Sequence, residues 1–296
     1  MSRVSGRGVV EALRATYSNV LLLELDSTVG RALQDNGVEV VFPVLHGPPG
    51  EDGTFQGYLE ILGFPYVGSA VHASACAMDK IVAKHLFRDA GLPVAHDLIL
   101  DRGVGVSGAA DEVLTRFGSA VVVKPSRQGS AVGVRFPNGK ADLEAALAEA
   151  FNYDARVLVE ERIVGREITV GIIERTSVEA LPVLEVRTPA GSWYDFQHRY
   201  TAGLSEHLVP APLPSAQYNR TQELAVRAHA ALGCRDLSRV DFVVPDDGEP
   251  VVLEVNTLPG MTPTSLYPDA ARAAGLSFEG LVQILVERAW SRRTAA

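Results

Sequence analysis

The sequence predicts a mixed α/β fold, in which a doubly wound parallel-sheet domain precedes two α+β units. Three observations support this prediction. Near the N-terminus, short apolar runs alternate with segments of helical periodicity. One such run leads into a loop rich in glycine and proline, and open α/β sheets bind ligands at the carboxyl ends of their strands. Near the C-terminus, two runs of β-branched residues flank an Asp-Asp-Gly turn and predict an antiparallel hairpin.

Residues 1–79 are expected to form the doubly wound domain, because apolar runs of strand length alternate there with helical segments. In chain order, the expected elements are a helix at 8–14, strands at 20–25 and 38–45, a helix around 55–62, a strand at 65–67 and a helical segment over 73–90. Gly91-Leu92-Pro93 ends the last helical segment, since proline does not continue a helix.

Residues 80–169 and 170–296 are expected to form the two α+β units. For the first unit, the patterns predict strands at 97–100, 120–124, 132–136 and 157–161, and helices at 110–117 and 141–151. For the second unit, they predict strands at 169–173 and 181–186, a long loop through Tyr200, a helix at 216–232, the hairpin and a closing helix after Phe278.

Composition excludes several classes of function. The chain has 296 residues, a length that exceeds what one core usually supports, and 47% of its residues are hydrophobic. A formal net charge of −9 argues against a nucleic-acid partner, which would need a basic stripe. No apolar run reaches membrane-spanning length and the N-terminus lacks a signal-peptide core, so no membrane association and a cytoplasmic location are expected. Cys76 and Cys234 lack metal-ligand spacing and are expected to be inert thiols in a reducing compartment.

Polar residues gather on one face of the predicted hairpin, whose strands are expected at 240–244 and 251–255. If Asp241 lies opposite Glu254, then Arg239 lies opposite Asn256. Because side chains alternate between the faces of a strand, these four project together, and the opposite face carries Val240, Phe242, Leu253 and Val255. Two carboxylates and an amide oxygen suit Mg²⁺ with phosphate oxygens and water. The other reading is a surface hairpin whose charges merely pair, but the rigid loop 257–263 that follows favours a binding wall.

Residues 124–133, KPSRQGSAVG, predict a turn that binds phosphate. Small residues let successive backbone N–H groups point at one anion, and Lys124 stands at the mouth of the turn. Residues 157–163 predict a strand that ends in acids beside an apolar residue, which suits an adenine edge and a ribose hydroxyl. GVGVSG at 103–108 matches GxGxxG, but no strand with an acidic end follows at the expected distance, so a surface loop is the preferred interpretation. No GxxxxGK[ST] motif is present.

Seven segments in order resemble the D-alanine–D-alanine ligase family of the ATP-grasp superfamily. They are VVFPVLHGPPGEDGTFQG at 40–57, PYVGSAVHASACAMDK at 65–80, AGLPV at 90–94, VVVKPSRQGSAVGV at 121–134, VEERIVGREITVGI at 159–172, YDFQHRY at 194–200, and RVDF with LEVNTLPGMTPTSLYP within 239–268. The resemblance covers nearly everything from Val40 to the C-terminus. It implies an ATP-grasp fold in which the two α+β units enclose ATP.

The resemblance also implies how ATP and metal are bound. The implied ligands are Lys80, Lys124 and Arg199 for the ATP phosphates, Glu160, Ile163 and Glu167 for adenosine, and Asp241, Glu254 and Asn256 for two Mg²⁺ ions, for which Mn²⁺ can substitute. The metal residues are those that the hairpin geometry selects independently.

The implied reaction joins two molecules of D-alanine through an acylphosphate, for synthesis of peptidoglycan precursors. The implied residues are Arg239 and the backbone N–H of Gly260 at the oxyanion, Ser265 and the backbone N–H of Leu266 at the acceptor carboxylate, His46 near the donor, and Ser130 and Tyr200 pinning a loop over the closed site. A homodimer through the N-terminal domain is also implied.

The chain departs from the family pattern in three places. Arg199 stands where lysine is usual, and Gln197 stands where glutamate is expected. The usual first strand and its Ser-x-Glu-type motif, whose glutamate binds the donor amino group, have no match, since Ser5-Gly6-Arg7 resembles the helix that follows them. A start codon assigned too far downstream is the favoured explanation, because His46 and the GEDG loop are retained; a variant with another donor specificity is the second.

Two rival functions remain open. One is a ligase of a secondary pathway with a different donor or acceptor. The other is a nucleotide-binding homologue without ligase activity.

Overall fold

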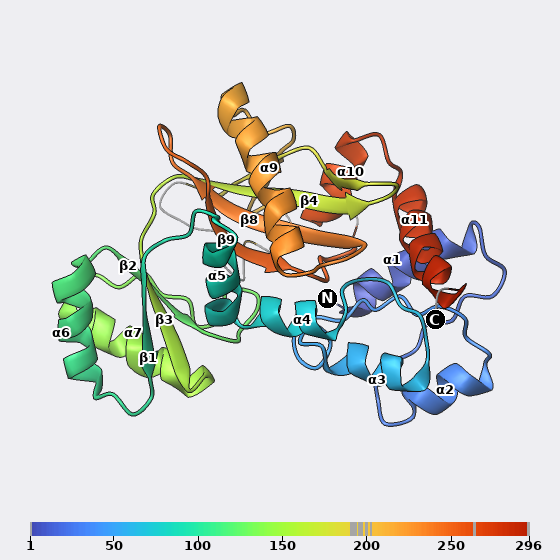
Figure 1. The fold of residues 1–296 in the computed structure, drawn as a ribbon, viewed down its shortest axis with the longest axis horizontal. Coiled ribbons are helices and arrows are strands. Elements are labelled where there is room, and N and C mark those ends of the chain that lie inside the picture. The colour runs from blue at the N-terminus through green and yellow to red at the C-terminus, as the bar shows by residue number, and fades with distance from the viewer. Residues whose placement is uncertain are drawn as a thin grey trace.

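The computed structural model describes residues 2–189, 194, 198, 201, 203–262 and 265–294, and over these residues it contains two antiparallel sheets with helices packed on them (Figure 1). The mixed α/β class predicted from the sequence is confirmed.

The smaller sheet has the strand order β1-β3-β2 and is covered on one face by two helices. Its elements are β1 (Asp97–Asp101), β2 (Val121–Pro125), β3 (Arg156–Glu161), α6 (Val106–Phe117) and α7 (Lys140–Tyr153). On β3, Val157 and Val159 pack against the helices, so the alternate residue Glu160 projects to the other face. Val123 of β2 also packs toward the helices, which places Lys124 on the same side as Glu160.

The larger sheet runs β7-β6-β4-β8-β9, and β5 pairs with the carboxyl end of β4. Its strands are β4 (Arg166–Glu174), β5 (Val178–Ala180), β6 (Leu184–Arg187), β7 (Glu206–Leu208), β8 (Leu237–Val244) and β9 (Val251–Asn256). Apolar clusters join one face to α5 (Lys80–Asp89) and α9 (Ser215–Ala231), and the other to α1 (Ser2–Arg14), α10 (Leu266–Ala273) and α11 (Phe278–Ser291). Helices on both faces make this sheet the centre of the main core.

The hairpin of β8 and β9 has the predicted register, with Arg239 paired to Asn256 and Asp241 to Glu254. The prediction for Leu253 is wrong. A β-bulge next to Asp241 places Val252 opposite Phe242, and Val252 rather than Leu253 joins the core. Leu253 is the extra residue of the bulge, so the apolar alternation shifts by one position along β9.

The strands predicted at 20–25, 38–45 and 65–67 are wrong as regular strands. Among the described residues of these segments, the backbone pairing consists of one parallel bridge between Val41 and Tyr66. Side chains alternate over residues 40–45: Val40, Phe42 and Val44 pack toward α1, α10 and α11, while Val41 and Leu45 pack with α2 (Val29–Asp35) and α3 (Thr54–Leu62). Val38 also packs with α2 and α3 and does not follow this alternation. A short apolar run predicted a strand here, but a regular strand also needs a neighbour along its length for its hydrogen bonds.

The single helix predicted over 73–90 is two helices, α4 (Val71–Met78) and α5. Asp79 lies between them in an extended conformation (φ −93°, ψ 101°), and its carboxylate accepts hydrogen bonds from the backbone N–H groups of Ile81 and Val82. This N-cap makes Lys80 the first residue of α5.

Other differences are smaller. The strand predicted at 132–136 is reduced to an isolated bridge between Arg135 and Val123. Helices α2 and α10 and strands β5 and β7 had no predicted counterpart. In the described part of the chain, no helix has the length and apolar character needed to cross a bilayer.

Candidate functional site

Glu160 of β3 is buried between two lysines. Its carboxylate accepts hydrogen bonds from Lys84 Nζ and Lys124 Nζ, and the residue is 5% exposed. Burial by itself would raise the pKa of Glu160, but the positive charges of Lys124 and Lys84 outweigh burial and lower the pKa to about 2. Glu160 is therefore ionised at neutral pH, and it holds both lysines on the open face of the smaller sheet.

Lys84 is a site residue that the sequence analysis missed. It is 4% exposed, and its Nζ lies 3.8 Å from Asp97 Oδ1 in addition to the bond with Glu160. Burial lowers the pKa of Lys84 to about 8, although the charge of Glu160 opposes this effect. Lys84 follows Lys80 by four residues on α5, so the helical period places both on one face, and this spacing was the available signal.

We expect acid to destabilise the folded protein through Glu160 in a defined window. Its pKa is lowered from 4.5 to about 2, so its stabilisation is complete above pH 4.5 and is lost as the pH falls toward 2. A shift of this size corresponds to about 3 kcal/mol. The difference in unfolding free energy between the wild type and Glu160→Gln should shrink by that amount between pH 7 and pH 2, as measured by urea titration. A difference that is independent of pH would contradict the assignment.

The turn at 126–133 has an unusual backbone and is closed by Lys80. Ser130 and Ala131 have φ values of 52° and 61°, a left-handed conformation that costs about 1–2 kcal/mol for residues other than glycine. Lys80 Nζ donates to Gln128 O at 2.5 Å, and the backbone N–H of Lys80 donates to Ser126 O at 3.0 Å. The predicted phosphate turn is thus joined directly to the start of α5.

The polar face of the hairpin is organised by Asp241. Its Oδ1 accepts from Arg239 Nε at 2.8 Å and Thr169 Oγ1 at 2.7 Å, and its Oδ2 accepts from Arg239 Nη2 at 2.7 Å. Arg239 is 8% exposed; burial opposes its charge, but the carboxylate of Asp241 prevails and raises its pKa. Glu254 Oε2 lies 3.8 Å from Lys80 Nζ. The face predicted to bind metal is therefore adjacent to the lysine that closes the phosphate turn.

The hairpin offers oxygen ligands but no complete metal cage. Asn256 Oδ1 accepts the backbone N–H of Leu258 at 2.9 Å, which orients the amide. Within the described residues, no group of three or more His, Cys, Asp or Glu side chains is placed to hold a metal ion. Asp241, Glu254 and Asn256 supply two carboxylates and one amide, a set that suits Mg²⁺ when phosphate oxygens and water complete its shell. The residues therefore fit a metal that binds together with a phosphorylated ligand.

His46 reaches the hairpin from the loop after residues 38–45. A Cβ atom on Gly260 would lie 2.9 Å from Ser265 Oγ and 3.9 Å from His46 Cε1, so these three residues meet. Burial lowers the pKa of His46 to about 4, with a contribution from Arg239, so the imidazole is neutral at pH 7. His46 Nε2 is buried and has no hydrogen-bond partner in the part of the chain that the structure describes. A buried nitrogen of this kind is a candidate for contact with a ligand.

Glu51 is a second residue that the sequence analysis did not single out, although it identified the surrounding GEDG loop. Its carboxylate accepts the backbone N–H of Gly47, and its Oε1 lies 4.0 Å from His46 Nδ1. Glu51 Oε2 lies 4.0 Å from the position of a Cβ on Gly129. Burial raises the pKa of Glu51. Glu51 therefore brings the His46 loop against the phosphate turn.

The remaining predicted residues occupy different parts of the site. Ser265 is the N-cap of α10, and its Oγ accepts the backbone N–H of Thr262 at 3.1 Å. Leu266 begins that helix, where backbone N–H groups have no partner inside the helix. Glu167 lies two residues before Thr169 on β4, hence on the same face, and its Oε1 accepts the backbone N–H of Tyr194 at 3.3 Å.

Three of the predicted residues are less well located by these contacts. Ile163 follows the end of β3 and is partly buried. Arg199 and Tyr200 lie outside the described residues, as does Gln197.

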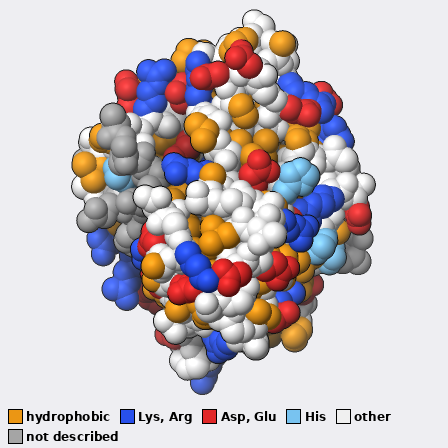
Figure 2. Space-filling view, turned by 90° about the vertical axis from the view of Figure 1, so that its left-hand side faces the viewer, with side chains coloured by type: hydrophobic (Ala, Val, Ile, Leu, Met, Phe, Trp, Pro, Cys, Tyr) orange, Lys and Arg blue, Asp and Glu red, His pale blue; other side chains and the backbone are white. Residues whose placement is uncertain are grey.

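Two hollows of about 340 and 370 Å³ lie next to β1 and α6. They are lined by Arg88, His96, Asp97, Leu98, Ile99 and Arg116, and by His96, Arg116, Phe117 and Glu161. Figure 2 shows this end of the molecule, where basic and acidic side chains are interspersed. No residue of the hairpin, the phosphate turn or the His46 loop lines either hollow, so we assign them no part in the site.

Comparison with known proteins gives matches along most of the chain. The family model described as D-ala D-ala ligase C-terminus matches residues 86–287, and that described as D-ala D-ala ligase N-terminus matches residues 24–69. The D-alanine–D-alanine ligase of Desulforudis audaxviator is 45% identical over 289 residues, which cover 97% of this chain and 93% of the relative. That of Halalkalibacterium halodurans is 44% identical, with coverages of 97% and 93%.

Solved structures also resemble this one. The D-alanine–D-alanine ligase of Bacillus anthracis complexed with ATP gives a TM-score of 0.84 at 30% identity, covering 99% of this chain and 94% of that one. The VanG D-Ala:D-Ser ligase of Enterococcus faecalis gives a TM-score of 0.76 at 37% identity, with coverages of 85% and 73%. The similarity therefore extends to both sheets and the segments between them.

Proposed function

The chain belongs to the D-alanine–D-alanine ligase family, and from this premise we infer that it is an ATP-dependent ligase that joins two molecules of D-alanine. The observation that supports this most directly is the register of the hairpin. This register sets Arg239, Asp241 and Glu254 on one face, beside Lys80, the residue of α5 that closes the phosphate turn. The product, D-alanyl-D-alanine, would serve as a precursor of cell-wall peptidoglycan, as the family resemblance implies.

ATP is proposed to bind between the open face of the smaller sheet and the hairpin. The proposed ligands are Lys80, Lys124 and Arg199 for the phosphates, and Glu160, Ile163 and Glu167 for adenosine. The position of Lys80 supports this, since it contacts the phosphate turn and lies near Glu254. Asp241, Glu254 and Asn256 would hold two Mg²⁺ ions, or Mn²⁺, whose charge would offset that of the phosphate oxygens during transfer.

The first step activates one D-alanine. Its carboxylate oxygen attacks the γ-phosphorus, the bond from that phosphorus to ADP breaks, and an acylphosphate forms. We propose that the neutral imidazole of His46 contacts this first substrate, because Nε2 is buried beside Gly260 and lacks a partner among the described residues. Ser130 and Tyr200 are proposed to hold a loop over the acylphosphate, which would exclude water.

The second step forms the amide. The amine of the second D-alanine attacks the acyl carbon, an oxyanion develops, and the bond to phosphate then breaks as the amine loses its proton. Arg239 and the backbone N–H of Gly260 are proposed to stabilise the oxyanion. Arg239 is already fixed by two bonds to Asp241, so it needs little reorganisation. The hydroxyl of Ser265 and the backbone N–H of Leu266 would bind the second carboxylate at the N-terminus of α10.

A cytoplasmic location and a homodimer are also proposed. ATP is available in the cytoplasm, and both cysteines are free thiols, in keeping with a reducing compartment. Leu21 and Leu22 are 43% and 47% exposed on the N-terminal part of the chain, which supports an interface there. Light scattering after gel filtration would test the dimer.

The proposed function predicts release of ADP that depends on D-alanine, together with formation of D-alanyl-D-alanine. Coupled ADP measurement and mass spectrometry of the product would follow both. D-serine and D-lactate should be offered with D-alanine, because VanG, similar over 85% of this chain, is a D-Ala:D-Ser ligase. Preference for D-serine as second substrate would reassign the chain to a secondary pathway, and ATP binding without product from any pair would refute ligase function.

A further inference from the structure

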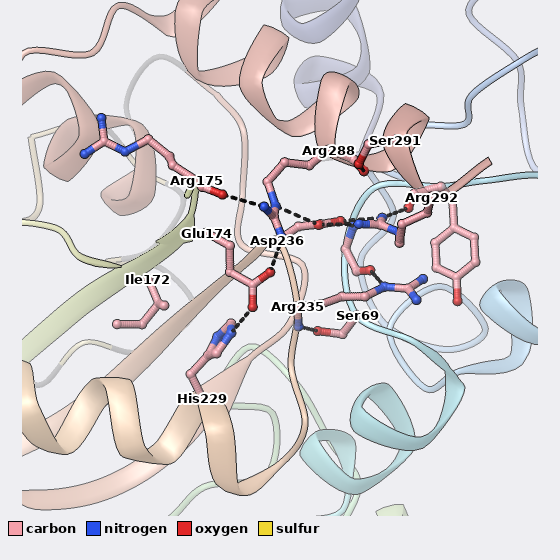
Figure 3. Close-up of polar contacts among 12 residues, drawn as sticks. Ser69, Ile172, Glu174, Arg175, His229, Arg235, Asp236, Arg288, Ser291 and Arg292 are labelled. Carbon is pink, nitrogen blue, oxygen red and sulfur yellow. Dashed lines mark hydrogen bonds and ion pairs between the residues drawn. The ribbon is translucent and has the colours of Figure 1, made fainter. Parts of the chain in front are cut away.

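Asp236 lies in a cluster of polar contacts with Arg288 and Arg292 (Figure 3). It immediately precedes β8, is fully buried, and has a left-handed φ of 63°. Its carboxylate accepts from the backbone N–H of Gly68 at 2.8 Å, from Arg292 Nη1 and Nη2 at 2.6 and 2.7 Å, and from Arg288 Nε at 3.4 Å. A left-handed conformation is unfavourable for residues other than glycine, and it persists where surrounding contacts impose it.

The segment 66–69 is attached to the same place through its backbone. Arg292 Nη2 donates to Tyr66 O at 2.7 Å, and Arg235 Nε donates to Gly68 O at 2.8 Å. The backbone N–H of Arg235 donates to Ser69 Oγ at 3.3 Å, and its guanidinium carbon lies 4.9 Å from the centre of the Tyr66 ring. Arg292, Asp236 and Arg235 thus bind three backbone groups of this segment, which are Tyr66 O, the N–H of Gly68 and Gly68 O.

Residues 65–71, which include this segment, in turn contact both ends of the His46 loop. Val41 exchanges backbone hydrogen bonds of 2.9 Å with Pro65 O and with the N–H of Val67, and residues 41–45 lead directly into His46. At the other end of the loop, a Cβ on Gly53 would lie 2.7 Å from Val71 O. Movement of residues 65–71 would therefore affect both ends of the loop.

The two paths from Asp236 meet again at Gly260. Along the chain, β8 carries Arg239, and the loop after β9 carries Gly260. Through space, the path runs from Gly68 to Val41 and on to His46. His46 Cε1 lies 3.9 Å from the Cβ position of the same glycine. We propose that Asp236 is a positioning residue that sets the distance between His46 and the Arg239–Gly260 pair, and hence the site for the first D-alanine. This inference rests on the proposed function.

Glu174 holds Arg288, one of the two arginines that bind the carboxylate of Asp236. It accepts from Arg288 Nη2 at 2.6 Å and from His229 Nε2 at 3.3 Å, and His229 Nδ1 lies 2.8 Å from Ser238 Oγ (Figure 3). Arg288 is thereby shared between Glu174 and Asp236. Because Arg288 keeps Glu174 as a partner, loss of the Asp236 carboxylate should loosen the 66–69 segment without unfolding the sheet.

The test uses Asp236→Gly, which accommodates the left-handed backbone but removes the carboxylate, and Asp236→Asn, which keeps the shape but removes the charge. We expect the KM for the first D-alanine to rise about tenfold in both, while the KM for ATP changes by less than about twofold. Hydrogen exchange of peptides covering 38–47 and 64–70 should become faster. A merely structural role would lower the active fraction and leave every KM unchanged, and that outcome would overturn the proposal.

The matched control is Glu39→Gln. Glu39 also links the N-terminal part to the end of the chain, through Arg293 Nη1 at 2.8 Å, but both side chains are mostly exposed. This variant should leave both the KM values and hydrogen exchange unchanged. If the wild type shows no ligase activity, the proposed function fails on its own, and hydrogen exchange still decides the connection. Unchanged exchange in Asp236→Gly would refute it even in an active ligase.

Discussion

Replacing Arg239 by lysine is expected to lower kcat by about 10²- to 10³-fold while the protein stays folded. Lysine retains a positive charge for Asp241. It cannot make the two parallel bonds that Arg239 makes through Nε and Nη2, at 2.8 and 2.7 Å, and still direct another N–H at the oxyanion. Steady-state ADP release with saturating ATP and D-alanine measures kcat, and thermal unfolding confirms that the variant is folded.

Arg187→Lys is a matched control for this prediction. Arg187 also pairs with an acid two positions away on its strand, since its Nε and Nη2 lie 3.0 and 3.4 Å from the Glu185 oxygens, but it is half exposed. Its replacement should change kcat by less than about twofold. Similar activities for the two variants would show that the buried pair does not act in the chemical step.

The hairpin could be predicted from the sequence because its determinants are local. A period of two fixes which side chains share a face, and a short turn fixes the pairing of Asp241 with Glu254. The bulge could not be predicted, since it depends on how the strand fits its neighbours. The bulge places Val252 rather than Leu253 in the core, but Arg239 and Asn256 remain opposite each other.

The prediction of regular strands in the N-terminal part was wrong for a non-local reason. The apolar run at 38–45 predicted a strand, and from residue 40 to residue 45 its side chains do alternate between two apolar clusters. Strand formation also depends on a hydrogen-bonding neighbour, and the bridge from Val41 to Tyr66 joins residues far apart in the sequence. The break at Asp79 was different, because an aspartate before a helical run is a recognisable N-cap that the interpretation of 73–90 as one helix overlooked.

The candidate site shows the same division. Residues inside motifs, such as Lys80 and His46, could be proposed from the sequence because the family resemblance singled them out. Lys84 and Asp236 could not, because their roles come from contacts with Glu160 and Gly68, 76 and 168 positions away. The four-residue spacing from Lys80 to Lys84 on α5 indicates a shared helix face, but neither contact itself follows from periodicity or composition.

Lys84→Met is expected to destabilise the protein by about 3–5 kcal/mol, because it removes one partner of a buried ion pair and leaves Glu160 with Lys124. Burial of Glu160 would then be opposed by a single cation, so the pKa of Glu160 should rise from about 2. Urea unfolding at pH 7 measures the stability. The low pKa of Lys84 itself, about 8, shows how strongly burial already acts at this position.

The same variant should raise the KM for ATP by about tenfold. Lys124 would then be the remaining lysine paired with Glu160, so its positive charge would be less available to a phosphate. The KM values for D-alanine should stay within about twofold, since His46, Gly260 and Ser265 do not contact Lys84. Lys140→Met is the control: Lys140 is 44% exposed and pairs with Asp111 at 2.5 Å, so its loss should leave the stability nearly unchanged. If Lys84→Met and Lys140→Met behave alike in stability and in the KM for ATP, Lys84 does not govern the charge of Glu160, and the lysine pair must bind nucleotide independently of it.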